Sequence, residues 1–82
     1  MKENMQGLIE YVARSLVDDP TQVEATQRNQ GSTTQIQLKV AKEDMGRVIG
    51  RNGKVANAMR LLLRVAAARD DQRVNLVIVE PE

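Results

Sequence analysis

Val48-Ile49-Gly50-Arg51-Asn52-Gly53-Lys54 carries two glycines three residues apart. Because glycine has no Cβ, such a pair lets the backbone turn sharply and approach another chain closely. We expect a short helix to end before the pair and a longer helix to begin at Lys54, with its free N–H groups and positive dipole end directed at the loop. An anion such as a phosphate is favoured there. Arg51 and Asn52 add a charge and an amide at the loop tip.

The charge of the chain is concentrated around this loop. The formal net charge of +1 by itself predicts no partner. Residues 45–69, however, contain six basic residues and no acidic one, whereas residues 1–34 contain three basic and five acidic residues. This asymmetry favours a surface for a polyanion. We predict phosphate contacts for Arg47, Arg51 and Lys54; for Arg60, Arg64 and Arg69 a solvated helix face remains an equal alternative.

Composition narrows the class of protein. The 82 residues fit one small domain, 1–82. The chain has no Cys and no His, so we expect no disulfide, no metal site, no cofactor and no enzyme activity. We find no apolar run of the roughly 18 residues that a membrane span needs and no signal peptide, which predicts a cytoplasmic protein without a membrane partner. Tyr11 is the only aromatic residue, which counts against modules that stack bases on aromatic rings.

Hydrophobic spacing predicts the order helix–strand–strand–helix–helix–strand. A helix capped by Asn4 lies within residues 1–20 and is ended by Pro20. Residues 21–41 form a hairpin with a turn at 29–32, and the alternation of Ile36, Leu38 and Val40 marks its clearer strand. Residues 42–69 form helix, glycine loop and helix, and residues 73–80 a final strand before Pro81. This pattern predicts an α+β domain with a three-stranded sheet and three helices on one face.

The long helix has more apolar surface than one sheet requires. One stripe is made by Ala56, Met59, Leu63 and Ala66. The adjacent stripe needs another cover, which is either the first helix or a second copy of the protein. The second alternative predicts a two-fold dimer interface centred near Leu62, in which the small residues 66–68 allow close approach. Its predicted residues are Val55, Ala58, Leu61, Leu62 and Val65.

The segment from Gly46 to Lys54, in this element order, resembles a type II KH domain. Val48 occupies a position where a Walker A loop and a Rossmann fingerprint both need glycine, so neither of these motifs fits. A free-standing domain of this length, whose first helix carries Leu-Ile-x-x-Val, is similar to the KhpA family of small bacterial RNA-binding proteins. The resemblance implies an RNA chaperone and post-transcriptional regulator that forms homodimers and associates with KhpB, a larger KH-containing partner. It also implies a link to cell elongation, cell shape and cell-wall synthesis.

The resemblance assigns RNA contacts along this segment. It implies a backbone clamp at Gly50, Arg51, Asn52 and Gly53, with Arg47 and Lys54 beside it. It implies a groove for bases made by Val48, Ile49 and either Ile36 or Leu38. Ala56 departs from the family pattern, which usually has a large aliphatic residue there, so that either the core thins beneath the loop or Val55 compensates.

We therefore predict single-stranded RNA binding without chemistry. The clamp would hold about four nucleotides. The alternatives are a protein-interaction module with RNA binding secondary, and single-stranded DNA as the ligand, because loop clamping does not by itself read the 2′-hydroxyl. The sequence also leaves open whether the dimer is formed with a second copy or with a different partner.

Overall fold

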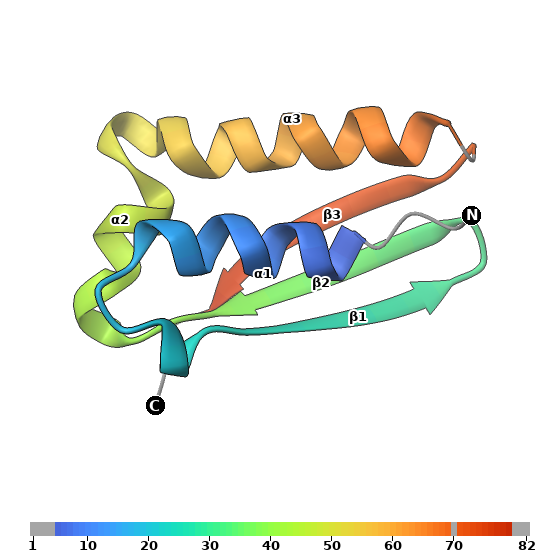
Figure 1. Cartoon of the computed structure of the whole chain (residues 1–82). Helices are drawn as coiled ribbons and strands as arrows, with labels where there is room; N and C mark the ends of the chain where they lie inside the picture. Colours follow the sequence, from blue (N-terminus) through green and yellow to red (C-terminus); the bar gives the residue numbers. More distant parts are fainter. Residues whose placement is uncertain (1–4, 70, 80–82) are drawn as a thin grey trace.

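The computed structural model describes residues 5–69 and 71–79, which form an α+β domain of two layers, a sheet and a layer of helices. The main elements are α1 (Met5–Leu16), β1 (Glu24–Gln30), β2 (Thr33–Lys39), α2 (Met45–Ile49), α3 (Lys54–Ala68) and β3 (Arg73–Val79). The three helices lie on one face of the sheet (Figure 1). The element order and the fold class are those that the sequence predicts. The predicted roles of Asn4 and Pro81 lie outside the described residues.

The sheet is mixed, with the strand order β1-β2-β3. β1 and β2 are antiparallel neighbours joined by a tight turn, so that Gln30 pairs with Thr33. The turn predicted at 29–32 is therefore shorter, because the positive φ of Gly31 (61°) reverses the chain within Gly31 and Ser32. β2 and β3 are parallel, and parallel neighbours need a crossover, which α2, the glycine loop and α3 provide.

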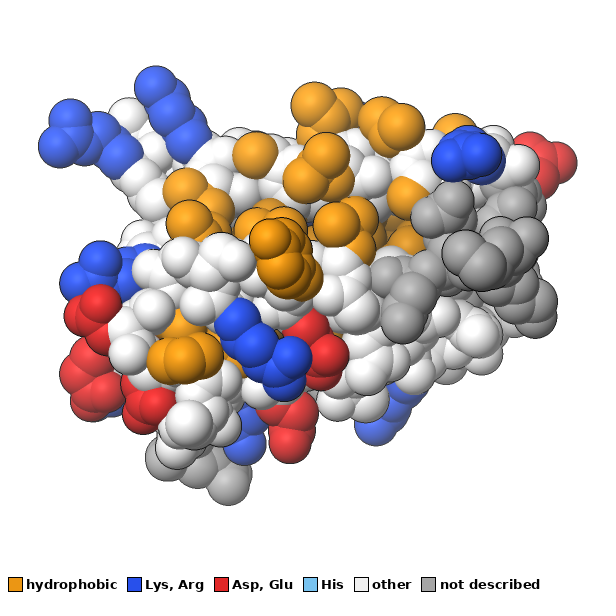
Figure 2. Space-filling model, viewed as in Figure 1, with side chains coloured by type: hydrophobic (Ala, Val, Ile, Leu, Met, Phe, Trp, Pro, Cys, Tyr) orange, Lys and Arg blue, Asp and Glu red, His pale blue; other side chains and the backbone are white. Residues whose placement is uncertain are grey.

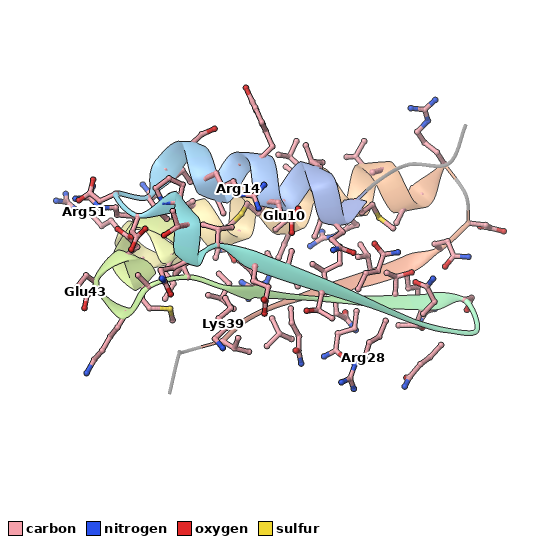
Figure 3. The ribbon with its side chains drawn as sticks, turned by 60° about the horizontal axis from the view of Figure 1, so that its bottom comes forward. Glu10, Arg14, Arg28, Lys39, Glu43 and Arg51 are labelled. Carbon is pink, nitrogen blue, oxygen red and sulfur yellow. The ribbon has the colours of Figure 1, made fainter. Side chains whose placement is uncertain are left out.

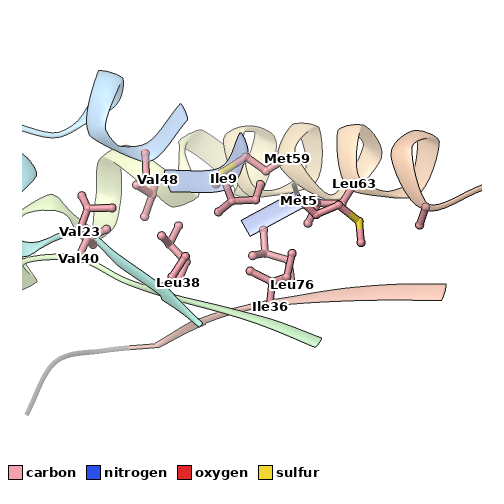
Figure 4. Packing of buried hydrophobic residues seen from close by; sticks show 13 residues of the cluster. Met5, Ile9, Val23, Ile36, Leu38, Val40, Val48, Met59, Leu63 and Leu76 are labelled. Atoms are coloured by element: carbon pink, nitrogen blue, oxygen red, sulfur yellow. The ribbon is translucent and has the colours of Figure 1, made fainter. Parts of the chain in front are cut away.

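One hydrophobic core lies between the sheet and the helices (Figure 4). The strands contribute alternate residues to it, because successive side chains of a strand point to opposite faces. Ile36 and Leu38 come from β2 and Leu76 from β3, while Ile9 comes from α1. The long helix contributes its predicted inner stripe, of which Ala56, Met59 and Leu63 are buried. The glycine loop therefore stands at the end of a helix that is anchored along its length.

A buried carboxylate fixes the short helix that leads into the loop. Asp44 is only 2% exposed. It accepts hydrogen bonds from the backbone N–H groups of Asp18 and Asp19, both at 3.1 Å, and the Nε of Arg47 lies 3.3 Å from the same carboxylate. Asp44 therefore ties the segment after α1 to the start of α2. The charge of a buried carboxylate needs such partners, and Arg47 is the cation among them.

Candidate nucleic-acid interface

The glycine loop has an unusual backbone. Gly50 has φ 78° and ψ 172°, a combination that is essentially restricted to glycine. Asn52 (φ 58°) and Gly53 (φ 76°) are left-handed, and asparagine and glycine tolerate that conformation better than other residues. The N–H of Gly50 donates to Gly46 O at 2.9 Å and that of Gly53 donates to Gly50 O at 3.2 Å, which closes the turn at both glycines. The sequence positions of the two glycines match these backbone requirements.

The two glycines differ in what lies around them. A Cβ added to Gly50 would be 2.5 Å from Cγ2 of Val55 and 2.8 Å from its backbone nitrogen. A Cβ added to Gly53 would meet nothing nearer than the Asn57 side chain at 3.8 Å. Gly50 is therefore needed for packing inside the protein. Gly53 instead leaves its backbone open on the outer side, where a ligand can come close.

The tip of the loop presents donors to solvent. Arg51, Asn52 and Lys54 are exposed, and Arg51 projects away from the body of the protein at the loop end (Figure 3). The first turn of α3 contains no acidic residue, and no side chain caps its N-terminus at Gly53. The N–H of Lys54 donates to Arg51 O, so it is the positive end of the dipole of this 15-residue helix that faces a ligand beside two cations. This arrangement favours an anion with several oxygen acceptors.

Arg47, for which the sequence predicts a phosphate contact, makes two ion pairs within the protein. In addition to Asp44, its Nη2 binds the carboxylate of Asp18 at 2.9 Å. Two carboxylates thus compensate its charge, and it joins α2 to the segment that follows α1. A phosphate that binds Arg47 has to compete with both carboxylates.

Three residues predicted to line a base groove are part of the core instead. Val48, Ile36 and Leu38 are each 0% exposed, so their side chains cannot contact a ligand. Ile49, the other predicted residue, is partly exposed beside the loop. The short helix α2 turns Val48 inward and Ile49 outward, because neighbouring helical residues point about 100° apart.

Val55 lies beneath the loop, and this settles the question raised by Ala56. Ala56 is buried, and half-buried Val55 packs against the core and against Gly50. The valine therefore supplies an aliphatic contact beneath the loop. This position also removes most of Val55 from the predicted dimer stripe.

The rest of the predicted dimer stripe is on the surface. Leu61, Leu62 and Val65 are 56%, 48% and 61% exposed, and Ala58 is exposed. The explanation that the first helix covers this stripe is wrong, because α1 lies alongside α3 and leaves these residues exposed; Leu8 and Tyr11 of α1 are exposed as well. Figure 2 shows the resulting apolar surface over α3 and α1. Of the small residues 66–68, Ala67 is buried in the core, and only Ala68 is exposed.

The opposite flank of α3 is polar and faces β3. Arg60 donates from Nε and Nη2 to the backbone oxygen of Leu76, at 3.4 and 3.3 Å. It also donates from Nη1 to Oδ1 of Asn57 at 3.3 Å. Arg64 follows one turn later and is exposed. Sequence patterns leave two equal alternatives for these arginines, and the link from Arg60 to a strand carbonyl has no sequence signal.

The rest of the described surface differs from the loop in character. The uncovered face of the sheet is largely polar, with Arg28 and Lys39 pointing away from the helices (Figure 3). Within residues 5–69 and 71–79, no three potential ligands from His, Cys, Asp and Glu gather as a metal site would require. Each helix in this part of the chain is too short or too polar to cross a bilayer.

Comparison with known proteins identifies relatives over nearly the whole chain. A family model described as KhpA/KhpB, KH domain matches residues 6–78. The RNA-binding protein KhpA of Clostridium acetobutylicum is 40% identical over 75 residues, which are 92% of this chain and 100% of the relative. The protein of the same name from Treponema pallidum is 42% identical over 75 residues, covering 92% and 94% of the two chains.

A solved structure has a similar fold. It is Era in complex with MgGDPNP and nucleotides 1506–1542 of 16S ribosomal RNA, with a TM-score of 0.57 and 14% sequence identity. The similarity covers 93% of this chain and 29% of the Era chain. At this identity the likeness concerns the fold alone.

Proposed function

The chain belongs to the KhpA/KhpB KH-domain family, and from this premise we propose that it binds single-stranded RNA through its glycine loop. The observation that carries the proposal is the uncapped N-terminus of α3 beside the exposed cations Arg51 and Lys54. The positive end of a helix dipole attracts phosphate. In KH domains a Gly-x-x-Gly loop clamps about four backbone nucleotides.

The mechanism is binding without a chemical step. Arg51, Lys54 and the positive end of the α3 dipole hold phosphates, and the open side of Gly53 lets the RNA backbone come close. Asn52 adds an amide that can donate to a phosphate or sugar oxygen. Ile49 provides an exposed aliphatic contact for an unstacked base. Arg47 acts indirectly, by holding α2 and hence the loop in position.

The salt dependence of binding tests this proposal. For single strands, log K falls with log salt concentration by about 0.7 per neutralised phosphate. With Arg51 and Lys54 as the main cations, we expect a slope of about −1.4. The measurement is fluorescence anisotropy of a mixed-sequence single-stranded RNA at several salt concentrations, with DNA of the same sequence in parallel. Absence of binding to RNA would overturn the proposal. Tighter binding of DNA than of RNA would mean that single-stranded DNA is the ligand.

We further propose that the apolar face of α3 and α1 is a dimer interface. Leu61, Leu62 and Val65 form a compact group that is about half exposed. A second copy with two-fold symmetry would cover the same group on both chains. This face and the polar flank that holds Arg60 lie on different sides of α3, so a dimer leaves the Arg60 flank accessible. Two loops on one RNA would raise the apparent affinity through effective concentration.

Leu62→Asp is expected to weaken self-association by about a hundredfold or more. A buried leucine contributes roughly 1.5–3 kcal/mol, and the substitution acts twice in a two-fold dimer. Analytical ultracentrifugation measures the change. Val77→Asp, at an exposed apolar residue of β3, is the matched control and should leave self-association unchanged.

RNA titrations of Leu62→Asp and Val77→Asp show whether RNA binding by the loop depends on the dimer interface. If Leu62→Asp is monomeric and still binds RNA, the interface and the loop act separately. A Leu62→Asp protein that still self-associates as the unaltered protein does would refute the interface.

We propose a cellular role on the resemblance to the family. The protein would act in the bacterial cytoplasm, where its RNA ligands are, as a chaperone-like post-transcriptional regulator linked to cell elongation, cell shape and cell-wall synthesis. The description of the family model also includes KhpB. A KhpB-like partner is therefore the alternative occupant of the apolar face.

A further inference from the structure

Arg60 occupies a distinctive position two turns beyond the loop. It is exposed, yet its guanidinium bridges α3 to β3 through the backbone oxygen of Leu76. β3 is an edge strand, because the sheet order is β1-β2-β3. The guanidinium therefore lies against the open edge of the sheet, on the flank of α3 that the proposed dimer leaves free.

The hydrogen bonds of Arg60 hold its guanidinium in a defined orientation. Nε and one N–H of Nη2 point to Leu76 O, and one N–H of Nη1 points to Asn57 Oδ1. A guanidinium has five N–H groups. The described bonds therefore leave one N–H on each of the two terminal nitrogens. The two terminal nitrogens of a guanidinium are neighbours in one plane, so these donors can engage two adjacent acceptors.

A guanine base carries the matching acceptors. Its O6 and N7 are neighbours on one edge, and arginine binds them with two parallel hydrogen bonds. Adenine has an amino group in place of O6, so it would bring a donor against a donor. Single-stranded RNA exposes these edges, because its bases are unstacked and turned outward when a protein holds the backbone.

The distance from the loop is suitable for such a contact. Arg60 lies six residues after Lys54, which corresponds to about 9 Å along α3. A clamp for about four nucleotides covers at least this length of a strand. A base attached to the clamped backbone can therefore reach the guanidinium without leaving the loop.

We propose that Arg60 is a specificity-determining residue that selects guanine in RNA held by the glycine loop. This inference rests on the proposed RNA-binding function. Arg64, on the same flank, makes none of the hydrogen bonds or ion pairs described for residues 5–69 and 71–79. No such contact fixes the orientation of its guanidinium. Arg64 therefore acts on RNA only through its charge.

The test compares base preference among four proteins. The ligands are uridine hexamers that carry a single guanine, or a single adenine, at each position in turn. We expect the unaltered protein to bind the best guanine hexamer about fivefold or more tightly than the matching adenine hexamer. Arg60→Lys keeps the charge but lacks the planar pair of donors, so it should retain overall affinity and lose the preference. Arg60→Gln should lose the preference and also weaken binding to every hexamer, because it removes a charge.

Arg64→Gln is the matched control. It removes one charge from the same flank and should weaken binding to all hexamers by a similar factor while the guanine preference remains. A purely structural role for Arg60 would change binding to all hexamers equally, and thermal unfolding by circular dichroism of each variant identifies such a loss. The inference is overturned if the unaltered protein shows no guanine preference, or if Arg60→Lys retains it. If no hexamer binds at all, the proposed function itself fails.

Discussion

Arg51→Asp combined with Asn52→Asp is expected to reduce the affinity for single-stranded RNA by about a hundredfold or more. The pair removes a cation and an amide donor from the loop tip and places two carboxylates where phosphates are proposed to bind. A hydrogen bond to a charged group contributes roughly 1.5–3 kcal/mol, and like charges add repulsion. Both side chains are exposed, so the fold should persist. RNA titration, with circular dichroism of the variant, measures the two effects.

The chain provides a closely matched control. Arg28 and Asn29 repeat the same dipeptide on β1, and both are exposed. Arg28 lies on the face of the sheet that the helices do not cover (Figure 3). Arg28→Asp with Asn29→Asp makes the same change in net charge, and the second substitution keeps a side-chain oxygen that can accept from the Thr34 hydroxyl. Equal losses in the two double variants would mean that net charge, and not the loop, governs RNA binding.

Most of the fold follows from local sequence signals. The alternation of Ile36 and Leu38 identifies β2, and the spacing of Met59 and Leu63 identifies the inner face of α3. These signals are strong because each element is half buried, so apolar residues recur with the period of the element. The shorter hairpin turn is not evident from the sequence, since the polar residues Asn29 and Gln30 resemble a loop while their backbones pair with β2.

The site is less predictable than the fold, for a physical reason. The loop itself depends on glycine and on the helix that follows, which are local features. The role of Arg47 depends on Asp18, which is 29 residues away, and no local pattern indicates that pair. Val48 and Ile49 are both aliphatic, and a helix of five residues is too short for its period to show which one faces inward. Arg60 binds a backbone oxygen, which every residue possesses.

Gly50→Ala is expected to lower the free energy of unfolding by about 2–4 kcal/mol. A φ of 78° with a ψ of 172° costs a residue with a Cβ about 1–3 kcal/mol. The added carbon would also stand 2.5 Å from Val55 Cγ2 and 2.8 Å from Val55 N, which is closer than atoms can pack. The backbone nitrogen cannot move away without shifting the start of α3. The loop should therefore distort, and RNA binding should fall together with stability. Urea unfolding and RNA titration measure the two losses.

Two other glycines separate backbone strain from steric conflict. Gly53→Ala should lower the free energy of unfolding by only about 1 kcal/mol, the cost of a left-handed backbone for alanine, because the space around Gly53 is open. Gly46→Ala, in the helix α2 with no atom within 4 Å of the new carbon, should stabilise the protein by up to about 1 kcal/mol. We expect Gly53→Ala to weaken RNA binding more than its stability loss explains, since its new methyl group occupies the side proposed for the RNA backbone.

Val55→Ala in the Gly50→Ala background completes the series. It removes the Cγ2 contact but keeps the backbone nitrogen at 2.8 Å and the Val55 Cβ at 2.9 Å from the new carbon. The rescue of stability should therefore be partial. Full rescue would mean that side-chain crowding alone excludes alanine, and a Gly50→Ala protein as stable as the unaltered one would contradict the described loop conformation. Partial rescue would show that the backbone of α3, and not only its side chains, requires glycine at position 50.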